Sequence, residues 1–227
     1  MMSGVVMAER WITKDGRRIP IDDGGGKIVA AGVAAIMILG SGGVTGGTGS
    51  SPVNVETVKV RKVNAKRSAR KGKSDEAWRR LGMRRLKQTT SRRNRACARA
   101  TFGEVQRTLI RNPCTSLQRR LIAIADRRGN TALVSVAWVS FRTSGARKRF
   151  QEVIDVYGTG DIKPLAASML GLAGVRFTGR YYHSIDKGAR LTVAEAENVK
   201  GAFEPKVLDG FAEIAAELPS PVTRRRR

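Results

Sequence analysis

The chain has 227 residues, of which 41% are hydrophobic and 5% aromatic, so it can bury one modest core beside its extensions. Lys and Arg number 43 against 19 Asp and Glu, and the resulting net charge of +24 predicts an acidic partner. A single histidine and two cysteines without a C-x-x-C pair exclude a zinc finger, and no metal or cofactor is predicted.

The first feature along the chain is an apolar run. Residues 1–27 form a polar N-terminal segment, residues 28–40 read IVAAGVAAIMILG, and no ionisable side chain follows until Glu56. Thirteen helical residues span about 20 Å, less than the roughly 30 Å of a bilayer core, so a spanning helix has to continue further. We therefore predict a membrane segment at 28–47, with a cleaved export signal or a soluble Gly-rich segment as alternatives.

The basic residues around this segment bear on its orientation. Lys27 directly precedes the apolar run, whereas the next basic residue beyond it is Lys59. Positive charge close to a membrane segment marks its cytoplasmic side. Five Lys or Arg precede the run and five follow within about twenty residues of its end, so their numbers do not decide the orientation. The proximity of Lys27 and the cysteine pair favour a single-pass protein of the cell membrane with its C-terminal domain outside.

A strongly basic stretch follows. Residues 55–100 hold seventeen Lys or Arg against three acids, and their large apolar residues are sparse. We predict that residues 48–91 form a flexible basic linker with a weak helix, which begins at the potential capping residue Ser74. Such charge favours an anionic lipid surface, a wall polymer or a nucleic acid as partner. The candidate polyanion-binding residues are Lys59, Arg61, Lys62, Lys66, Arg67, Arg70, Lys71, Lys73, Arg79, Arg80, Arg84 and Arg85.

Regular secondary structure is predicted over residues 92–219, with a basic tail at 220–227. An apolar stripe predicts a first helix that ends at Asn112-Pro113; it consists of Ala98, Phe102, Val105 and Leu109. Two strands, Leu117–Ala125 and Thr131–Phe141, are joined by a polar turn and predict a hairpin. The second strand is apolar on both faces, as expected of a central strand.

The pattern then repeats. A helical face over 150–157 ends near Gly158, and the segments Val175–Asp186 and Ala189–Asn198 predict a second hairpin. Pro205 begins a last helix. The order α-ββα-ββα predicts an α+β domain with a largely antiparallel sheet and with helices on one face.

The two cysteines, Cys97 and Cys114, leave two interpretations open. They form one disulfide if the domain is exported, and they are two buried free thiols if it is not.

Several segments of the chain are distinctive. They are RWITKDGRRIPI near the N-terminus, the apolar run, CTSL at 114–117, VSVAWVSF at 134–141, YGTGDIKPL at 157–165 and VRFTGRYYHS at 175–184. Together these segments resemble a family of uncharacterised actinobacterial proteins. The resemblance implies a layout of apolar segment, basic linker and small α+β domain. It implies no activity.

Residues with catalytic potential are few. His183 is the lone histidine, and Ser184, Asp186 or Cys114 are its possible partners in a hydrolytic site. The Gly158–Asp161 turn lacks the Lys-Ser/Thr of a P-loop. We therefore predict a membrane-tethered, non-enzymatic binding domain of unknown ligand and protein partner, and as the alternative a basic nucleic-acid-binding protein.

Overall fold

The computed structural model describes residues 11–14, 17–20, 55–172 and 174–221. The predicted membrane segment at 28–47 lies outside these residues. Near the N-terminus, β1 (Trp11–Lys14) and β2 (Arg17–Pro20) form an antiparallel hairpin. No helix of the described part of the chain is long and apolar enough to cross a membrane.

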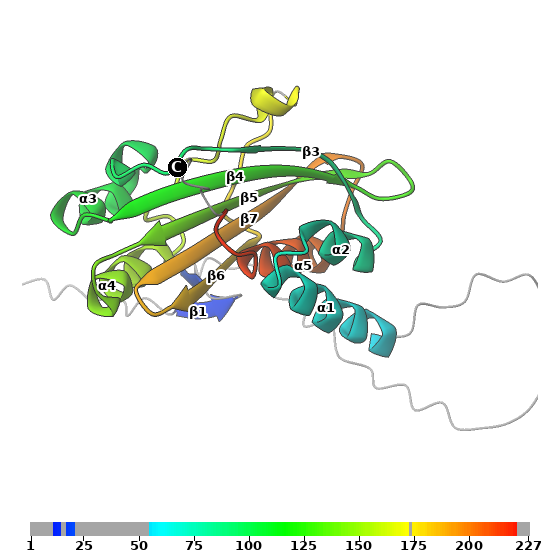
Figure 1. The fold of residues 1–227 in the computed structure, drawn as a ribbon, viewed down its shortest axis with the longest axis horizontal. Helices are drawn as coiled ribbons and strands as arrows, with labels where there is room; N and C mark the ends of the chain where they lie inside the picture. The colour runs from blue at the N-terminus through cyan, green and yellow to red at the C-terminus, as the bar shows by residue number, and fades with distance from the viewer. Residues whose placement is uncertain (1–10, 15–16, 21–54, 173, 222–227) are drawn as a thin grey trace, which may run out of the picture.

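The α+β class and the antiparallel sheet are confirmed. The sheet has the strand order β3-β4-β5-β7-β6, and every neighbouring pair is antiparallel (Figure 1). Its strands are β3 (Arg84–Thr90), β4 (Ser116–Ala125), β5 (Thr131–Ser140), β6 (Tyr182–Lys187) and β7 (Arg190–Lys200). The helices are α1 (Val55–Arg70), α2 (Ser74–Arg80), α3 (Gly103–Arg111), α4 (Ser144–Ile154) and α5 (Pro205–Ala216). Two 3-10 turns, η1 (Cys97–Ala100) and η2 (Ala167–Leu170), complete the described elements.

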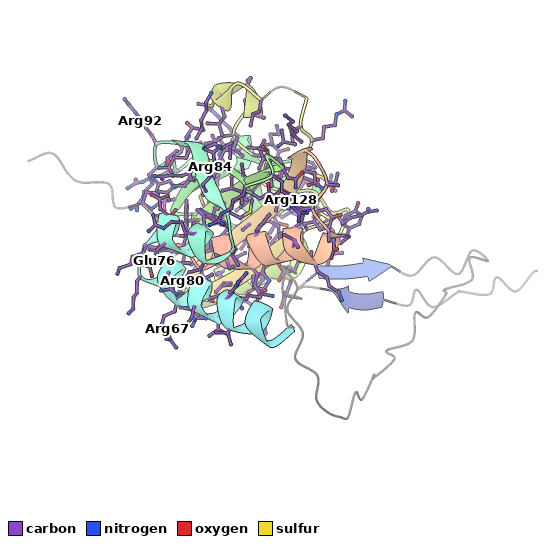
Figure 2. All side chains as sticks on the ribbon, turned by 90° about the vertical axis from the view of Figure 1, so that its right-hand side faces the viewer. Arg67, Glu76, Arg80, Arg84, Arg92 and Arg128 are labelled. Atoms are coloured by element: carbon purple, nitrogen blue, oxygen red, sulfur yellow. A yellow bond between two sulfur atoms is a disulfide. The ribbon has the colours of Figure 1, made fainter. Side chains whose placement is uncertain are left out.

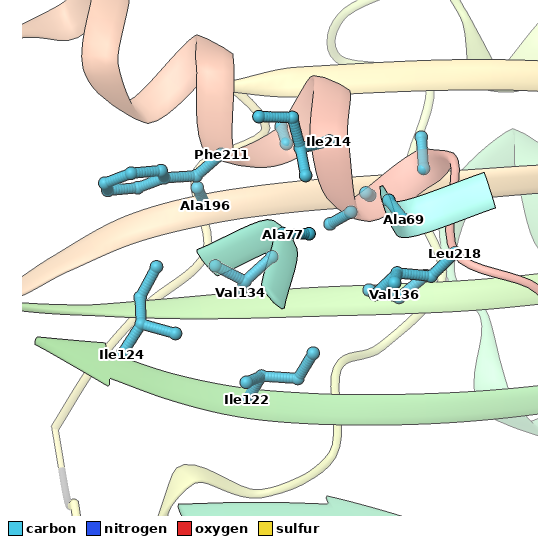
Figure 3. Packing of buried hydrophobic residues seen from close by; sticks show 14 of the residues in the cluster. Ala69, Ala77, Ile122, Ile124, Val134, Val136, Ala196, Phe211, Ile214 and Leu218 are labelled. Carbon is cyan, nitrogen blue, oxygen red and sulfur yellow. The ribbon is translucent and has the colours of Figure 1, made fainter. Parts of the chain in front are cut away.

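One face of the sheet packs on α1, α2 and α5. Ile122, Val134 and Ala196 lie side by side across β4, β5 and β7 because their registers match. They meet Phe211 of α5 and Ala77 of α2 in one buried cluster (Figure 3). Trp138 of β5 belongs to this cluster and is 2% exposed, as expected of a strand that was predicted to be central.

The opposite face is also covered, which corrects the expectation of helices on one face only. Leu117, Val139 and Leu191 pair across the sheet and pack with Phe150 of α4 and Val105 of α3. A third cluster unites Leu121, Ala123 and Leu133 with η2 and the chain that follows it. Because β5 is buried on both sides, its sequence is apolar at successive positions.

The weak helix predicted from Ser74 is present as α2, although Ser74 is its first residue rather than its cap, but the remainder of residues 55–91 is ordered rather than a flexible linker. These residues form α1, α2 and β3, and α1 buries Ala65 and Ala69 completely in the cluster beneath α5. The buried side of α1 consists of small residues four positions apart, whereas its larger Val60 and Val63 are exposed. An apolar stripe made only of alanines is a poor sequence signal among so many lysines and arginines.

The helix predicted across residues 98–109 is divided. Residues of η1 form one turn, and α3 begins only at Gly103, whose φ is +65°. Phe102, expected to be an inward-facing residue, is 47% exposed. A Cβ at Gly103 would collide with the carbonyl oxygen of Thr159, so the glycine marks a close approach between two loops.

The second hairpin is confirmed in type but not in extent. Its first strand, β6, begins at Tyr182 rather than Val175. Val175 and Phe177 instead pack against the third cluster, where they cover β4 and β5. Pro205 begins α5, as predicted.

Candidate polyanion-binding surface

The sequence between Glu76 and Glu104 contains nine Lys or Arg and no acid. The fold places its basic residues on the end of α2, the outer strand β3, the loop after it and η1. Two further arginines, Arg119 and Arg120, extend from β4 beside β3. We call this surface the basic edge; it consists of Arg79, Arg84, Arg85, Lys87, Arg92, Arg93, Arg95, Arg99, Arg119 and Arg120.

The basic edge lies along one side of the molecule. Figure 2 shows Arg92 and Arg84 above Arg80 of α2 and Arg67 of α1 on that side. Of the seven residues of β3, six are exposed and the other is half-buried. Charged residues on an outer strand also oppose pairing with the strand of another molecule.

Arg120 is the most informative residue of the basic edge. Its Nε donates a hydrogen bond to Thr90 Oγ1 at 3.2 Å, and its guanidinium lies 5.4 Å from the centre of the Trp138 ring. Burial, with a smaller contribution from the nearby charge of Arg85, lowers the pKa of Arg120. No carboxylate of the described residues pairs with Arg120, so the structure withdraws this cation from water without an internal counter-charge.

A polar hollow of about 490 Å³ opens beside Arg120. Four of its lining residues are basic and two are acidic: Lys73, Arg79, Arg85, Arg120, Asp75 and Glu76. Both carboxylates already hold cations, since Asp75 pairs with Arg85 at 2.9 Å and Glu76 pairs with Arg80 at 2.7 Å. The side chains that line the hollow therefore carry a net positive charge.

The structure divides the predicted polyanion-binding residues into two groups. Those in ion pairs within the domain are Lys62, Lys66, Arg70, Lys73, Arg80 and Arg85. Those without a carboxylate partner among the described residues are Arg61, Arg67, Lys71, Arg79 and Arg84. The side chain of Lys59 is not described. The first group mainly holds α1 and α2 in place, so half of the predicted set has a structural role.

Arg119 and Arg120 were not among the predicted residues. Their signal in the sequence is hidden, because successive strand residues point to opposite faces and both directly precede the apolar run at 121–125. The acid-free stretch from 77 to 103 is the clearer signal, and it also contains Arg92, Arg93, Arg95 and Arg99.

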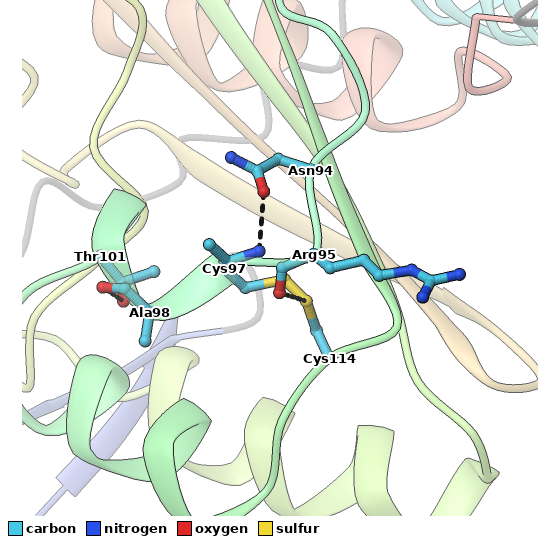
Figure 4. The surroundings of a disulfide bond; sticks show 7 residues. Asn94, Arg95, Cys97, Ala98, Thr101 and Cys114 are labelled. Carbon is cyan, nitrogen blue, oxygen red and sulfur yellow. Dashed lines mark hydrogen bonds between the residues drawn. A yellow bond between two sulfur atoms is a disulfide. The ribbon is translucent and has the colours of Figure 1, made fainter.

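The residues considered for hydrolytic chemistry do not converge with Cys114. His183 lies on β6, whereas Cys114 precedes β4, and β5 and β7 separate these two strands. Cys114 is also at disulfide distance from Cys97, with their Cα atoms 6.3 Å apart (Figure 4). This arrangement supports the disulfide interpretation and removes the thiol as a nucleophile.

The Gly158–Asp161 turn has a structural role. The carbonyl oxygen of Thr159 accepts a hydrogen bond from Glu104 N at 2.6 Å, at the start of α3. Gly160 has a φ of +110°, and a Cβ there would collide with the Phe102 carbonyl. The turn thus presents a carbonyl to a helix start rather than N–H groups to an anion.

The two tyrosines before His183 point to opposite faces, as strand alternation predicts. Tyr182 is 2% exposed and donates a hydrogen bond to Asp155 Oδ1 at 2.7 Å, whereas Tyr181 packs against the cluster under α5. They do not form a platform for stacking bases.

The part of the chain that the structure describes holds no cluster of three or more potential metal-ligating side chains. Comparisons with models of protein families, with curated proteins and with solved structures find no match to this chain. The resemblance to an actinobacterial family therefore stays a prediction.

Proposed function

We propose that this protein is a non-enzymatic binding protein for extended polyanions and that the basic edge is its contact surface. The observation that carries the proposal is Arg120, a half-buried guanidinium with no carboxylate partner among the described residues. Burying an uncompensated charge lowers stability unless a ligand supplies the opposite charge. A polyanion at the basic edge supplies it.

The shape of the basic edge suits an elongated ligand. β3 has seven residues, and at about 3.3 Å per residue it extends for about 23 Å. Because nucleic-acid phosphates are spaced by only a few ångström along a strand, such a length spans several of them. No element of the described domain supplies a helix with base-reading side chains in a recognised docking pattern, so we expect binding without sequence preference.

The tether remains part of the proposal. If residues 28–47 anchor the chain, the basic edge operates close to a membrane, where anionic lipids or a wall polymer supply the charge. The alternative is a nucleic-acid-binding protein that has no anchor. Both alternatives use the same basic edge and differ in the presence of a membrane anchor, which fractionation with high salt and then detergent tests.

The test replaces three exposed cations of the basic edge that have no carboxylate partner among the described residues. The variant Arg79→Gln/Arg84→Gln/Arg92→Gln is titrated with mixed-sequence duplex DNA and with anionic vesicles at two salt concentrations. A matched control, Arg142→Gln/Lys148→Gln/Arg190→Gln, removes the same charge at exposed positions away from β3.

We expect the basic-edge variant to bind more weakly and its salt dependence to flatten by about one unit of slope per lost phosphate contact. The control should retain the affinity of the wild type apart from a small general effect. Equal losses in the two variants would refute the basic edge as the contact surface. Salt-insensitive binding of one DNA sequence would instead establish specific recognition.

A further inference from the structure

Arg119 and Arg120 are neighbours on β4 but point to opposite faces of the sheet. Arg119 donates a hydrogen bond from Nη1 to the Lys163 carbonyl oxygen at 2.6 Å, which fixes one side of its guanidinium. Burial lowers the pKa of Arg119, and none of the described carboxylates pairs with it. Its remaining N–H groups are donors without a counter-charge.

A second hollow, of about 270 Å³, lies next to Arg119. Its lining contains three arginines, two short polar side chains and no acid: Ser91, Arg92, Arg93, Asn94, Ala96, Ala100, Leu117 and Arg119. In this it differs from the hollow beside Arg120, where two carboxylates line the wall. Its volume admits a group several times the size of a water molecule.

The wall of this hollow is held in place by backbone contacts. Ser91 N donates to the Arg119 carbonyl at 2.8 Å, and Arg119 N donates to Ser91 Oγ at 2.9 Å. Asn94 and Leu117 exchange a pair of backbone hydrogen bonds, of 2.9 and 2.7 Å. The loop that carries Arg92 and Arg93 is therefore anchored to β4 at two points.

Two further contacts fix the end of this loop. The Asn94 side-chain oxygen accepts a hydrogen bond from Ala96 N at 2.7 Å, which leaves the side-chain NH₂ as a donor. Cys97, the residue after Ala96, lies at disulfide distance from Cys114 (Figure 4). Donors that are already oriented lose little entropy when a ligand binds.

From this geometry we propose that the hollow lined by Ser91, Asn94 and Arg119 is a phosphate-binding subsite. The inference rests on the proposed function, because the subsite would hold one phosphate group of the polyanion. A phosphate offers several acceptor oxygens and up to two negative charges, and guanidinium groups bind such oxygens through paired hydrogen bonds. Because three arginines and no acid line the hollow, its charge matches a phosphate with two negative charges better than a carboxylate with one.

The test uses the full chain with inorganic phosphate as the probe. Binding is followed by NMR through the backbone amides of residues 91–94 and the Arg119 Nε–H signal, against sodium chloride at equal ionic strength. The variants are Arg119→Gln, Arg119→Lys and, as the control, Arg128→Gln on the exposed β4–β5 turn. A denaturation curve for each variant verifies folding.

We expect phosphate to shift these signals in the wild type and in Arg128→Gln. Arg119→Gln should weaken phosphate binding by about tenfold or more, since a hydrogen bond to a charged group is lost. The phosphate affinity of Arg119→Lys should lie between those of the wild type and Arg119→Gln, because lysine keeps the charge but not the paired donors.

The subsite is refuted if phosphate causes no specific shift in the wild type. It is also refuted if Arg119→Gln and Arg128→Gln lose equal phosphate affinity. In either case the proposed function stands as long as long polyanions still bind at the basic edge. If long polyanions fail to bind as well, the proposed function falls with it. The source of the phosphate is decided by repeating the Arg119→Gln comparison with duplex DNA and with phosphatidylglycerol vesicles. The ligand for which Arg119→Gln loses more affinity, DNA or the lipid, is the source of the phosphate group that the subsite binds.

Discussion

Trp138 joins the sheet to the end of α5 and also supports the basic edge. Its Nε1 donates a hydrogen bond to the Leu218 carbonyl at 2.8 Å, and the Arg120 guanidinium lies over its ring. Trp138→Phe keeps an aromatic ring but leaves a buried carbonyl without its donor. We expect a loss of about 1–3 kcal/mol in the free energy of unfolding beyond the cost of the smaller ring, measured by chemical denaturation.

The chain supplies a matched control at Trp78, which is fully buried in the same cluster. Among the described residues, Trp78 Nε1 has no acceptor, so Trp78→Phe removes ring volume without breaking a hydrogen bond. Trp138→Phe should therefore be the more destabilising of the two. Equal losses would show that the bond to Leu218 contributes nothing measurable.

A set of ion pairs connects α1 to α5 and explains why so basic a helix packs on the core. Lys62, Lys66 and Arg70 recur every four residues on α1, and they pair with Glu213 of α5 and with Glu217 directly after it. Arg70 Nε donates to Glu217 Oε2 at 2.8 Å. The repeated spacing puts both sets of charges on facing sides of the two helices.

These pairs predict a pH dependence. Burial alone raises the pKa of Glu213, but the hydrogen bonds and charges of Lys62 and Lys66 outweigh it and lower the pKa below its ordinary value of 4.5. A lowered pKa in the folded state contributes stability that is present above about pH 4.5 and is lost as the pH falls through the folded value. Glu213→Gln should destabilise the domain at pH 7 and weaken its response to acid, as measured by thermal unfolding between pH 3 and 7.

The exposed Glu152 of α4 provides the comparison for this prediction. Glu152→Gln removes the same charge without disturbing the contact between α1 and α5, so its unfolding curve should follow that of the wild type at each pH. An acid response of Glu213→Gln identical to that of the wild type would contradict the assigned role of these pairs.

The disulfide connects η1 to the segment directly before β4. Cys97 and Cys114 are 17 residues apart, and closing a loop of this length stabilises a domain by about 3 kcal/mol. We expect reduction, or Cys97→Ser/Cys114→Ser, to lower the free energy of unfolding by this order and to loosen the loop that carries Arg92 and Arg93. Denaturation with and without reductant measures the first effect, and non-reducing mass spectrometry verifies the pairing.

The elements also show what the sequence could predict. β4, β5 and α5 were found because long apolar patterns and terminal Pro or Gly signals agree there. α1 and β3 were missed for different reasons. α1 buries alanines and relies on ion pairs with a helix that lies far along the chain, and β3 is an exposed outer strand with only Leu86 as a large apolar residue. Tertiary partners, not local propensity, decide both elements.

At the scale of the whole molecule, helices cover both faces of the sheet and leave the outer strand β3 exposed. The two basic hollows therefore lie on either side of one strand pair, with Arg120 on one face and Arg119 on the other. The density of positive charge predicted polyanion binding, but it could not indicate which cations pair internally. That division depends on α5, whose acids lie about 150 residues beyond α1.

The segment at 28–47, which lies outside the described residues, is predicted to be a membrane anchor. Its apolar run is free of charge, and an arginine at mid-bilayer costs about 2.5–3.5 kcal/mol, comparable to the total insertion energy that a few Ile, Val and Leu residues supply. Ile36→Arg should therefore move the full chain from the membrane to the soluble fraction, whereas Ser50→Arg, which adds the same charge beyond the apolar run, should not. Fractionation with high salt and then detergent distinguishes the anchor from binding through the basic edge, because salt screens charge but does not extract a spanning helix. Release of the wild-type chain by salt alone would eliminate the anchor and leave the basic edge as the only membrane contact of this proposal.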